Sequence, residues 1–197
     1  MRWRSFAVGI LAIGPGLCTG FGAAEGAGPW RGQVVDAETG QPISGVVILA
    51  EWRKRSPGFI HSRVEFYDAE EAVTDREGRF VVPARSTRAL NPLVTIEGPI
   101  LHMFKSGYGR WRFRGSAGWG KLDLAEHDRL HNEAWMRFEG PGAVFELPPS
   151  RTREERLKSL SEAWPWSKIP DSRMRRYLRA LDDEREALGL QPSGRGK

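Results

Sequence analysis

The chain has 197 residues and a formal net charge of +5, with 40% hydrophobic and 28% charged residues. This composition excludes an intrinsically disordered protein, because the apolar share is large enough for a packed core. It also excludes a disulfide-rich scaffold, since the sequence contains a single cysteine. The length predicts one domain with a modest extension.

Residues 1–24 have the pattern of a secretory signal peptide. A basic start is followed by an apolar stretch over residues 6–18, and small residues precede Ala24, after which we expect cleavage. The apolar stretch is shorter than the ~20 residues that cross a bilayer. We therefore expect an exported protein, periplasmic or secreted, with no transmembrane segment in the mature chain.

Cys18 is the only cysteine and lies inside this predicted signal. A lipoprotein acceptor would need a large aliphatic residue three positions earlier and a small residue directly before it, but Pro15 and Leu17 stand there. These neighbours argue against lipidation. The mature protein is then expected to lack cysteine, which excludes thiol catalysis and disulfides.

Residues 29–149 are predicted to form a β domain after a short Gly/Ala linker. Residues 32–50 predict a hairpin of two strands around an Asp-to-Gly turn that ends at Gly40. A second turn of this kind ends at Gly78 and leads into another strand. Residues 51–72 between them are interpreted as an insertion that contains an extra strand or hairpin arm.

The pattern G-x-V-x-D-x-x-T-G-x-P-I-x-G-V-x-I, followed by T-D-x-x-G-x-F, resembles the carboxypeptidase regulatory-like domain family. The matching residues are Gly32, Val34, Asp36, Thr39, Gly40, Pro42, Ile43, Gly45, Val46, Ile48, Thr74, Asp75, Gly78 and Phe80. Residues 100–108 are similar to a later strand of that family. The resemblance implies a mainly β fold, a prealbumin-like antiparallel β-sandwich of about seven strands, and an accessory or interaction module without catalytic residues.

Residues 108–114 alternate between apolar and basic side chains, as expected of a strand with one buried face. Residues 122–135 predict a short helix or irregular loop, and residues 143–147 predict a last strand. Residues 150–190 predict a helical extension, with Thr152 and Glu155 in a capping-box pattern. We expect its helices to dock on the β domain, and residues 191–197 to be disordered.

Four residues are candidates for ligand contact. Trp52 and Trp119 lie beside predicted loops, where an exposed indole stacks on a sugar ring. Arg110 and Arg112 belong to the basic face of the alternating strand and suit an anionic glycan or lipid headgroup. Aromatic residues interleaved with Arg also occur in single-stranded nucleic-acid sites, but the predicted export argues against such a partner.

His127 and His131 are four residues apart, which places both on one face of a helix. Two such side chains and a nearby carboxylate can hold a metal ion. Asp128 follows the first histidine, however, where a metalloprotease has Glu, and the sequence indicates no third ligand. We therefore predict no catalytic residues, no cofactor and no metal.

Three functional hypotheses remain open. The first is a non-catalytic binding or scaffold module that contacts another protein of the cell envelope through the helices or residues 51–72. The second is a module that binds envelope glycans. The third is a metal-dependent hydrolase that uses His127 and His131.

Overall fold

A computed structural model describes residues 26–58, 61–87, 89–165 and 168–195, so the predicted signal peptide and Cys18 lie outside the described residues. The strands are β1 (Gly26–Ala27), β2 (Trp30–Asp36), β3 (Val47–Ser56), β4 (Arg63–Val73), β5 (Arg79–Val82), β6 (Arg85–Ser86), β7 (Thr95–Phe104), β8 (Arg112–Phe113) and β9 (Ala143–Leu147). The helices are η1 (Ser116–Lys121), α1 (Leu124–Glu139), α2 (Arg153–Glu162), η2 (Asp171–Arg173) and α3 (Arg175–Ala187).

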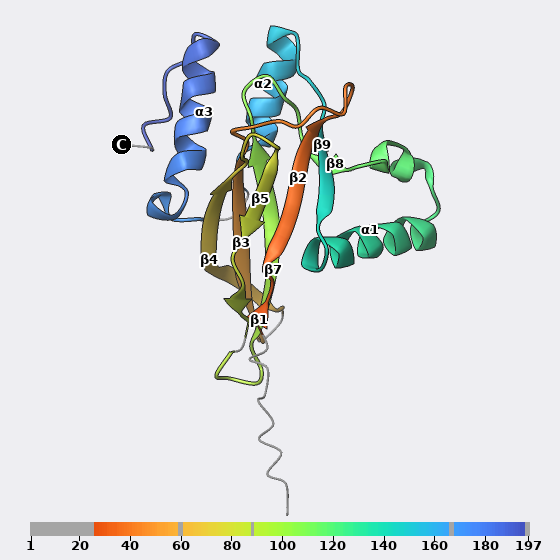
Figure 1. The fold of residues 1–197 in the computed structure, drawn as a ribbon. Coiled ribbons are helices and arrows are strands. Elements are labelled where there is room, and N and C mark those ends of the chain that lie inside the picture. Colours follow the sequence, from red (N-terminus) through yellow and green to blue (C-terminus); the bar gives the residue numbers. More distant parts are fainter. Residues whose placement is uncertain (1–25, 59–60, 88, 166–167, 196–197) are drawn as a thin grey trace, which may run out of the picture.

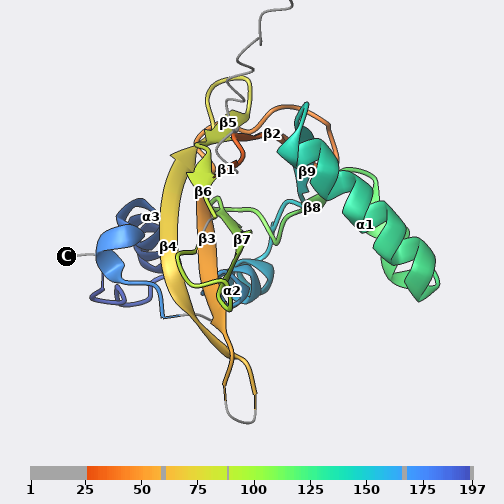
Figure 2. The same cartoon turned by 90° about the horizontal axis from the view of Figure 1, so that it is seen from below.

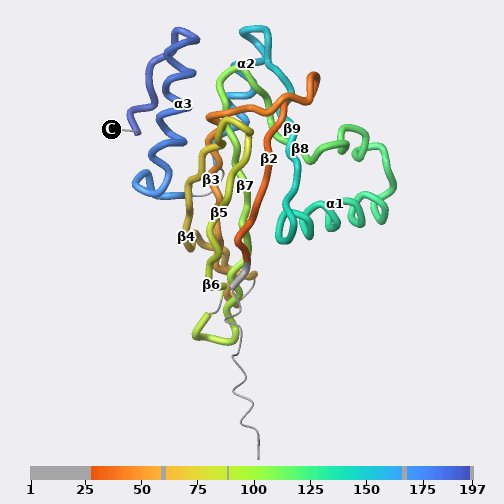
Figure 3. The backbone as a smooth tube through the Cα atoms, in the orientation of Figure 1, coloured from red at the N-terminus to blue at the C-terminus, as the bar shows by residue number. Residues whose placement is uncertain are grey.

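The strands form two main sheets and one short pair, so the protein is sheet-rich as predicted. One sheet has the order β5-β2-β9-β8 and the other has the order β4-β3-β7 (Figure 1). The short pair consists of β1 and β6. Pairing is antiparallel except between β2 and β9, which run parallel from Gly32 and Ala143 onward. The tube in Figure 3 shows these two strands side by side although the chain visits most other elements between them.

The predicted hairpin over residues 32–50 is wrong, because β2 and β3 belong to different sheets. The turn within it does form. The Asp36 carboxylate accepts from the backbone N–H groups of Glu38 and Thr39 at 2.8 Å each, and Gly40 has a positive φ of 71°. Ten residues separate the two strands, a connection long enough to cross from one sheet to the other instead of closing a tight hairpin.

Residues 51–72 are also not an insertion. Residues 51–56 belong to β3 and residues 63–72 to β4, so the extra strand predicted here is present and pairs antiparallel with β3, with a register shift between Trp52 and Arg53. The side chain of Trp52 is completely buried and packs on Trp30, with ring centroids 5.5 Å apart. The prediction that Trp52 is exposed was therefore wrong. β3 continues through this position as a central strand, so its apolar side chain faces the core.

Most of the core lies between the two main sheets. A single hydrophobic cluster contains residues of β2, β5, β8 and β9 from one sheet and of β3 and β7 from the other. Gly32 makes room for the largest rings in it. A Cβ atom there would lie 2.5 Å from Phe80 and 2.7 Å from Phe145, so the close approach of these rings requires glycine.

A second hydrophobic cluster joins α2 and α3 to the outer face of the β4-β3-β7 sheet, which confirms the expected docking of the C-terminal helices. The sheet contributes Val47, Leu49, Ala69 and Phe104, and the helical region contributes Leu160, Ile169, Met174, Tyr177, Leu178, Leu181 and Leu188. The predicted capping box of Thr152 and Glu155 is present at the start of α2. Figure 2 shows α3 beside β4 and α1 extending away on the opposite side.

The segment that follows α3 was expected to be disordered, but its described part makes defined contacts. The Ser193 N–H donates to Asp182 at 2.6 Å, and Arg195 forms an ion pair with Asp171 at 2.6 Å. These bonds return the chain along α3 towards η2. Residues 196–197 lie outside the described residues.

The segment 122–135, predicted as a short helix or irregular loop, is helical: α1 begins two residues later and ends four residues later than the predicted span. Asp123 caps it by accepting from the N–H of Glu126 at 3.0 Å, and Phe138 near its end is fully buried among core rings. Within the described residues, no helix combines the length and apolar character needed to cross a bilayer.

Candidate functional site

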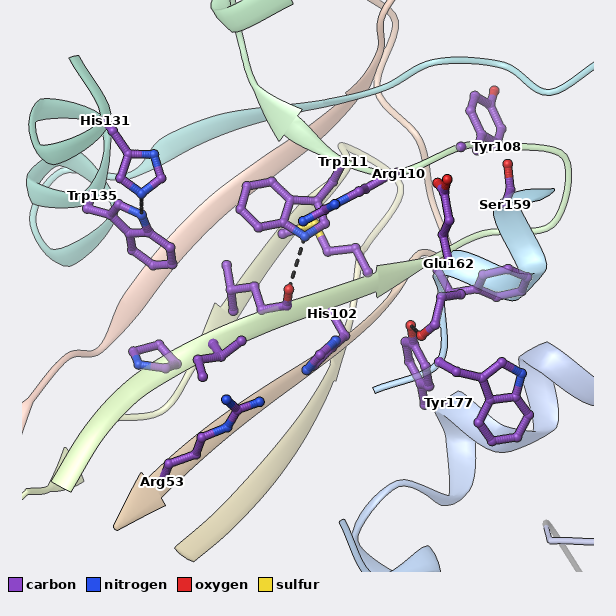
Figure 4. Close-up of a pocket in the computed structure, with 18 residues that line it drawn as sticks. Arg53, His102, Tyr108, Arg110, Trp111, His131, Trp135, Ser159, Glu162 and Tyr177 are labelled. Carbon is purple, nitrogen blue, oxygen red and sulfur yellow. Dashed lines mark hydrogen bonds between the residues drawn. The ribbon is translucent and has the colours of Figure 1, made fainter. Parts of the chain in front are cut away.

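A groove of about 380 Å³ lies along β7, between α1 on one side and α2 on the other (Figure 4). Its volume falls within the range of ordinary ligand pockets. The lining residues are Arg53, Pro99, Ile100, Leu101, His102, Met103, Phe104, Tyr108, Gly109, Arg110, Trp111, His131, Trp135, Ser159, Glu162, Ala163, Trp164 and Tyr177. Strand, loop and all three α-helices therefore meet at this place.

The base of the groove is the free edge of a sheet. β7 is the last strand in the order β4-β3-β7 and pairs only with β3 within the described chain. The indole N–H of Trp111 donates to the carbonyl of Leu101 at 3.0 Å, so this carbonyl points away from β3 and into the groove. Pro99 lies two residues earlier, and proline occurs in sheets chiefly at such edges because it has no N–H to donate.

A buried carboxylate underlies the same strand. The Glu51 side chain is completely buried and accepts from Arg53 at 2.7 and 3.2 Å, and the His102 ring lies 3.3 Å from it. A buried charge requires such partners, because desolvation without them costs several kcal/mol. The three groups come from neighbouring strands β3 and β7, and Arg53 and His102 extend from the carboxylate to the groove.

The α1 wall is aromatic. The Trp135 indole N–H donates to Nε2 of His131 at 2.7 Å, and the His131 ring stacks on His127 with centroids 6.0 Å apart. In this arrangement the lone pair of His131 Nε2 accepts a hydrogen bond and is not free to bind a metal. Among the described residues, no group of three His, Cys, Asp or Glu side chains has a geometry that could hold a metal ion.

The α2 wall is fixed by buried polar contacts. Burial alone would raise the pKa of Glu184, but hydrogen bonds from Arg156 and Ser106 outweigh burial and lower that pKa below its ordinary value. Arg156 is on α2 and Glu184 on α3, so the ion pair holds the two helices together. Burial raises the pKa of Tyr177, whose neutral hydroxyl donates to the Ala163 carbonyl at 2.7 Å directly after α2.

The loop from β7 to β8 closes one end of the groove. Burial raises the pKa of Tyr108, and the nearby Asp36 carboxylate adds to this effect. The backbone N–H of Thr39 is the main cause that lowers the pKa of Asp36. At neutral pH a neutral Tyr108 therefore donates to an ionised Asp36, which ties this loop to the turn after β2.

The structure separates the four predicted contact residues. Arg110 is exposed, lines the groove and has no ion pair within the described chain. Arg112 instead pairs with Glu146 on β9 at 3.1 Å, outside the groove. Trp119 is partly buried on η1, where it packs edge-on against His127 at 6.4 Å, and Trp52 is in the core.

Sequence reasoning missed most of the groove. Neither Trp135 nor His102 was nominated for ligand contact. The alternation of Leu101, His102 and Met103 along one strand carries a signal, since it places a histidine opposite two core residues. Nothing in the sequence indicates that Glu162 and Trp164 lie beside this strand, because that depends on how the helices dock.

Comparisons with models of protein families, with curated proteins and with solved structures found no match to this sequence.

Proposed function

We propose that this protein is an exported, non-catalytic binding module that contacts another protein of the cell envelope through the groove along β7. For the fold, we propose the prealbumin-like sandwich of the carboxypeptidase regulatory-like family. The two sheets that share one core support that assignment, as do the turns at Gly40 and Gly78, both with positive φ. Export rests on the sequence pattern of residues 1–24.

One observation carries the functional proposal: a strand edge with no partner strand among the described residues forms the base of a groove with walls from separate elements. Free edges in monomeric proteins are usually blocked, because they pair readily with other chains. At the opposite edge of the same sheet, acidic side chains of β4 bind other elements. Arg85 and Arg173 bind Asp68 on β4, and Glu71 on β4 accepts from the start of α3.

The polar groups of the groove favour binding over catalysis. Glu51 is held by Arg53 and His102, and His131 Nε2 by Trp135. A general base needs a free lone pair within reach of a substrate. These side chains instead form a fixed surface, which suits recognition.

Glycan binding is a second candidate, and one observation favours it. Three indoles, those of Trp111, Trp135 and Trp164, line the groove. Indole faces pack on the apolar faces of sugar rings. These tryptophans differ from the two that the sequence nominated.

Photo-crosslinking in the intact envelope tests the proposal. A photoreactive amino acid replaces Arg110 in the groove of the full-length, C-terminally tagged chain, and replaces the exposed Glu77 in a matched control. We expect one discrete protein adduct from position 110 and none from position 77. The partner identified by mass spectrometry should then bind the purified protein at least tenfold more weakly after Arg110→Glu. An adduct with polysaccharide instead would favour the glycan candidate, and equal adducts from both positions would contradict the proposal.

A further inference from the structure

We propose that the partner of this groove is an extended segment that pairs with β7 as an added strand and alternates acidic with apolar residues. The inference rests on the proposed function and specifies its binding mode. It follows from the direction of the β7 backbone groups, from the two unlike walls of the groove and from its charge.

The backbone of β7 presents bonding groups to the groove at every second residue. In an antiparallel pair, the N–H and C=O of alternate residues point towards the partner strand and then away from it. The Leu101 carbonyl points away from β3, since it accepts from Trp111. Met103, two residues on, must therefore also direct its N–H and C=O outward.

These outward groups lack a partner in the part of the chain that the structure describes. The Trp111 indole donates to the Leu101 carbonyl. The outward groups that remain are the N–H of Leu101 and the N–H and C=O of Met103. Both residues are only 5% exposed. Buried backbone groups are nearly always paired, so a strand that fills the groove would complete an unfinished ladder.

The dimensions of the groove suit an extended chain. Six consecutive residues of β7, Pro99 to Phe104, line it. At ~3.3 Å per residue this edge is about 20 Å long. Strand addition to an exposed edge is a common mode of peptide recognition, with affinity from main-chain bonds and specificity from pockets for alternate side chains.

The two walls differ in chemistry, which predicts the sequence of the added strand. Side chains of a strand point alternately to opposite faces of a sheet. On the face of the inter-sheet core, the added strand would meet Trp111 and Trp135, which suit apolar residues. On the opposite face it would meet Arg53, which uses Nε and one Nη for Glu51 and keeps further guanidinium N–H groups for a carboxylate.

The charge of Arg110 also favours an acidic partner. Arg53 is paired with the buried Glu51, so the exposed charged groups of the groove are Arg110 and Glu162. Arg110 has no ion pair among the described residues. An acidic segment would supply that partner.

A designed peptide tests the inference with purified full-length protein. The probe is an end-blocked, fluorescent octapeptide of alternating Glu and Val. The first control has the same composition with four Glu followed by four Val. The second is a pair of alternating peptides, one N-methylated at every Glu and the other at every Val, so that each blocks one of the two registers. We expect saturable binding of the alternating peptide, at least tenfold weaker binding of the block peptide, and loss of binding for one of the two N-methyl registers. Binding should also slow hydrogen exchange at the Met103 amide.

Protein variants separate this inference from the proposed function. Arg110→Glu should weaken peptide binding at least tenfold, whereas Arg76→Glu, an exposed change on a distant turn, should not. If both N-methyl registers bind as well as the parent peptide, strand pairing is wrong. If no peptide binds while position 110 still crosslinks to an envelope protein, the proposed function stands and this inference fails.

Discussion

Glu184 is an acidic residue with a side chain only 2% exposed, and its contacts explain how α2 and α3 stay together. Arg156 donates to its two oxygens at 2.8 and 2.7 Å, and the Ser106 hydroxyl also donates to it. Removal of one partner from a buried ion pair leaves an uncompensated charge, which is far more costly than loss of an exposed pair.

Glu184→Gln should therefore lower the free energy of unfolding by about 3 kcal/mol at pH 7. The matched control is Glu186→Gln on the same helix, where the side chain is exposed and the change should stay within about 0.5 kcal/mol. Urea unfolding of both variants measures the difference. Equal stabilities would show that the pair contributes nothing.

The same residue predicts a pH dependence. Its pKa is lowered in the folded protein, so its stabilising contribution is complete above the unfolded value of about 4.3 and is lost as the pH falls through the folded value. The gap in stability between the wild type and Glu184→Gln should therefore be widest at neutral pH and narrow in acid. A gap that does not change with pH would contradict this assignment.

At the scale of elements, α3 begins without a cap from its own sequence. Its N-cap residue Met174 makes no side-chain hydrogen bond to the helix. The Glu71 carboxylate of β4 replaces that cap by accepting from the N–H groups of Arg176 and Tyr177 at 3.1 and 2.7 Å. A negative charge at this helix end also interacts favourably with the helix dipole.

Glu71→Ala should cost about 1 kcal/mol and speed hydrogen exchange at the Tyr177 amide, because that donor loses its acceptor. Glu71→Gln keeps an acceptor oxygen, so its stability and its exchange rate at the Tyr177 amide should lie between those of Glu71→Ala and the wild type. Glu77→Ala, in an exposed turn, is the matched control. Unchanged exchange at Tyr177 in the alanine variant would show that Glu71 does not cap α3.

At the scale of the whole molecule, the C-terminal helices are part of one folded unit. They cover Val47, Leu49 and Phe104 on the outer face of a sheet whose inner face is also buried. Burial of each large apolar side chain contributes roughly 1.5–3 kcal/mol. The predicted helical extension is therefore an integral part of the packed structure.

Deletion of residues 150–197 should therefore produce a chain that aggregates or unfolds, because it exposes the outer face of the sheet. Deletion of residues 191–197 alone should leave a soluble, cooperatively folding protein. Size-exclusion chromatography and thermal unfolding compare the two. A monomeric, folded product from the longer deletion would contradict this view of the helices.

Local signals in the sequence were reliable where neighbours along the chain decide the structure. The Asp36 turn and the Thr152 capping box form as predicted, since their bonds join residues at most four positions apart. Predictions failed where contacts between segments far apart in the sequence determine the structure. Trp52 is buried because β3 runs on between β4 and β7, and the groove depends on the docking of α2, which no local pattern contains.

The parallel pairing of β2 with β9 has a consequence for how the chain acquires its structure. Gly32 pairs with Ala143, so the first long strand lacks one neighbour until more than a hundred further residues have emerged from the ribosome. Contacts between such distant segments slow folding, because a long loop must close before they form. During that interval the open edge of β2 is vulnerable to aggregation, and a holding chaperone would protect it.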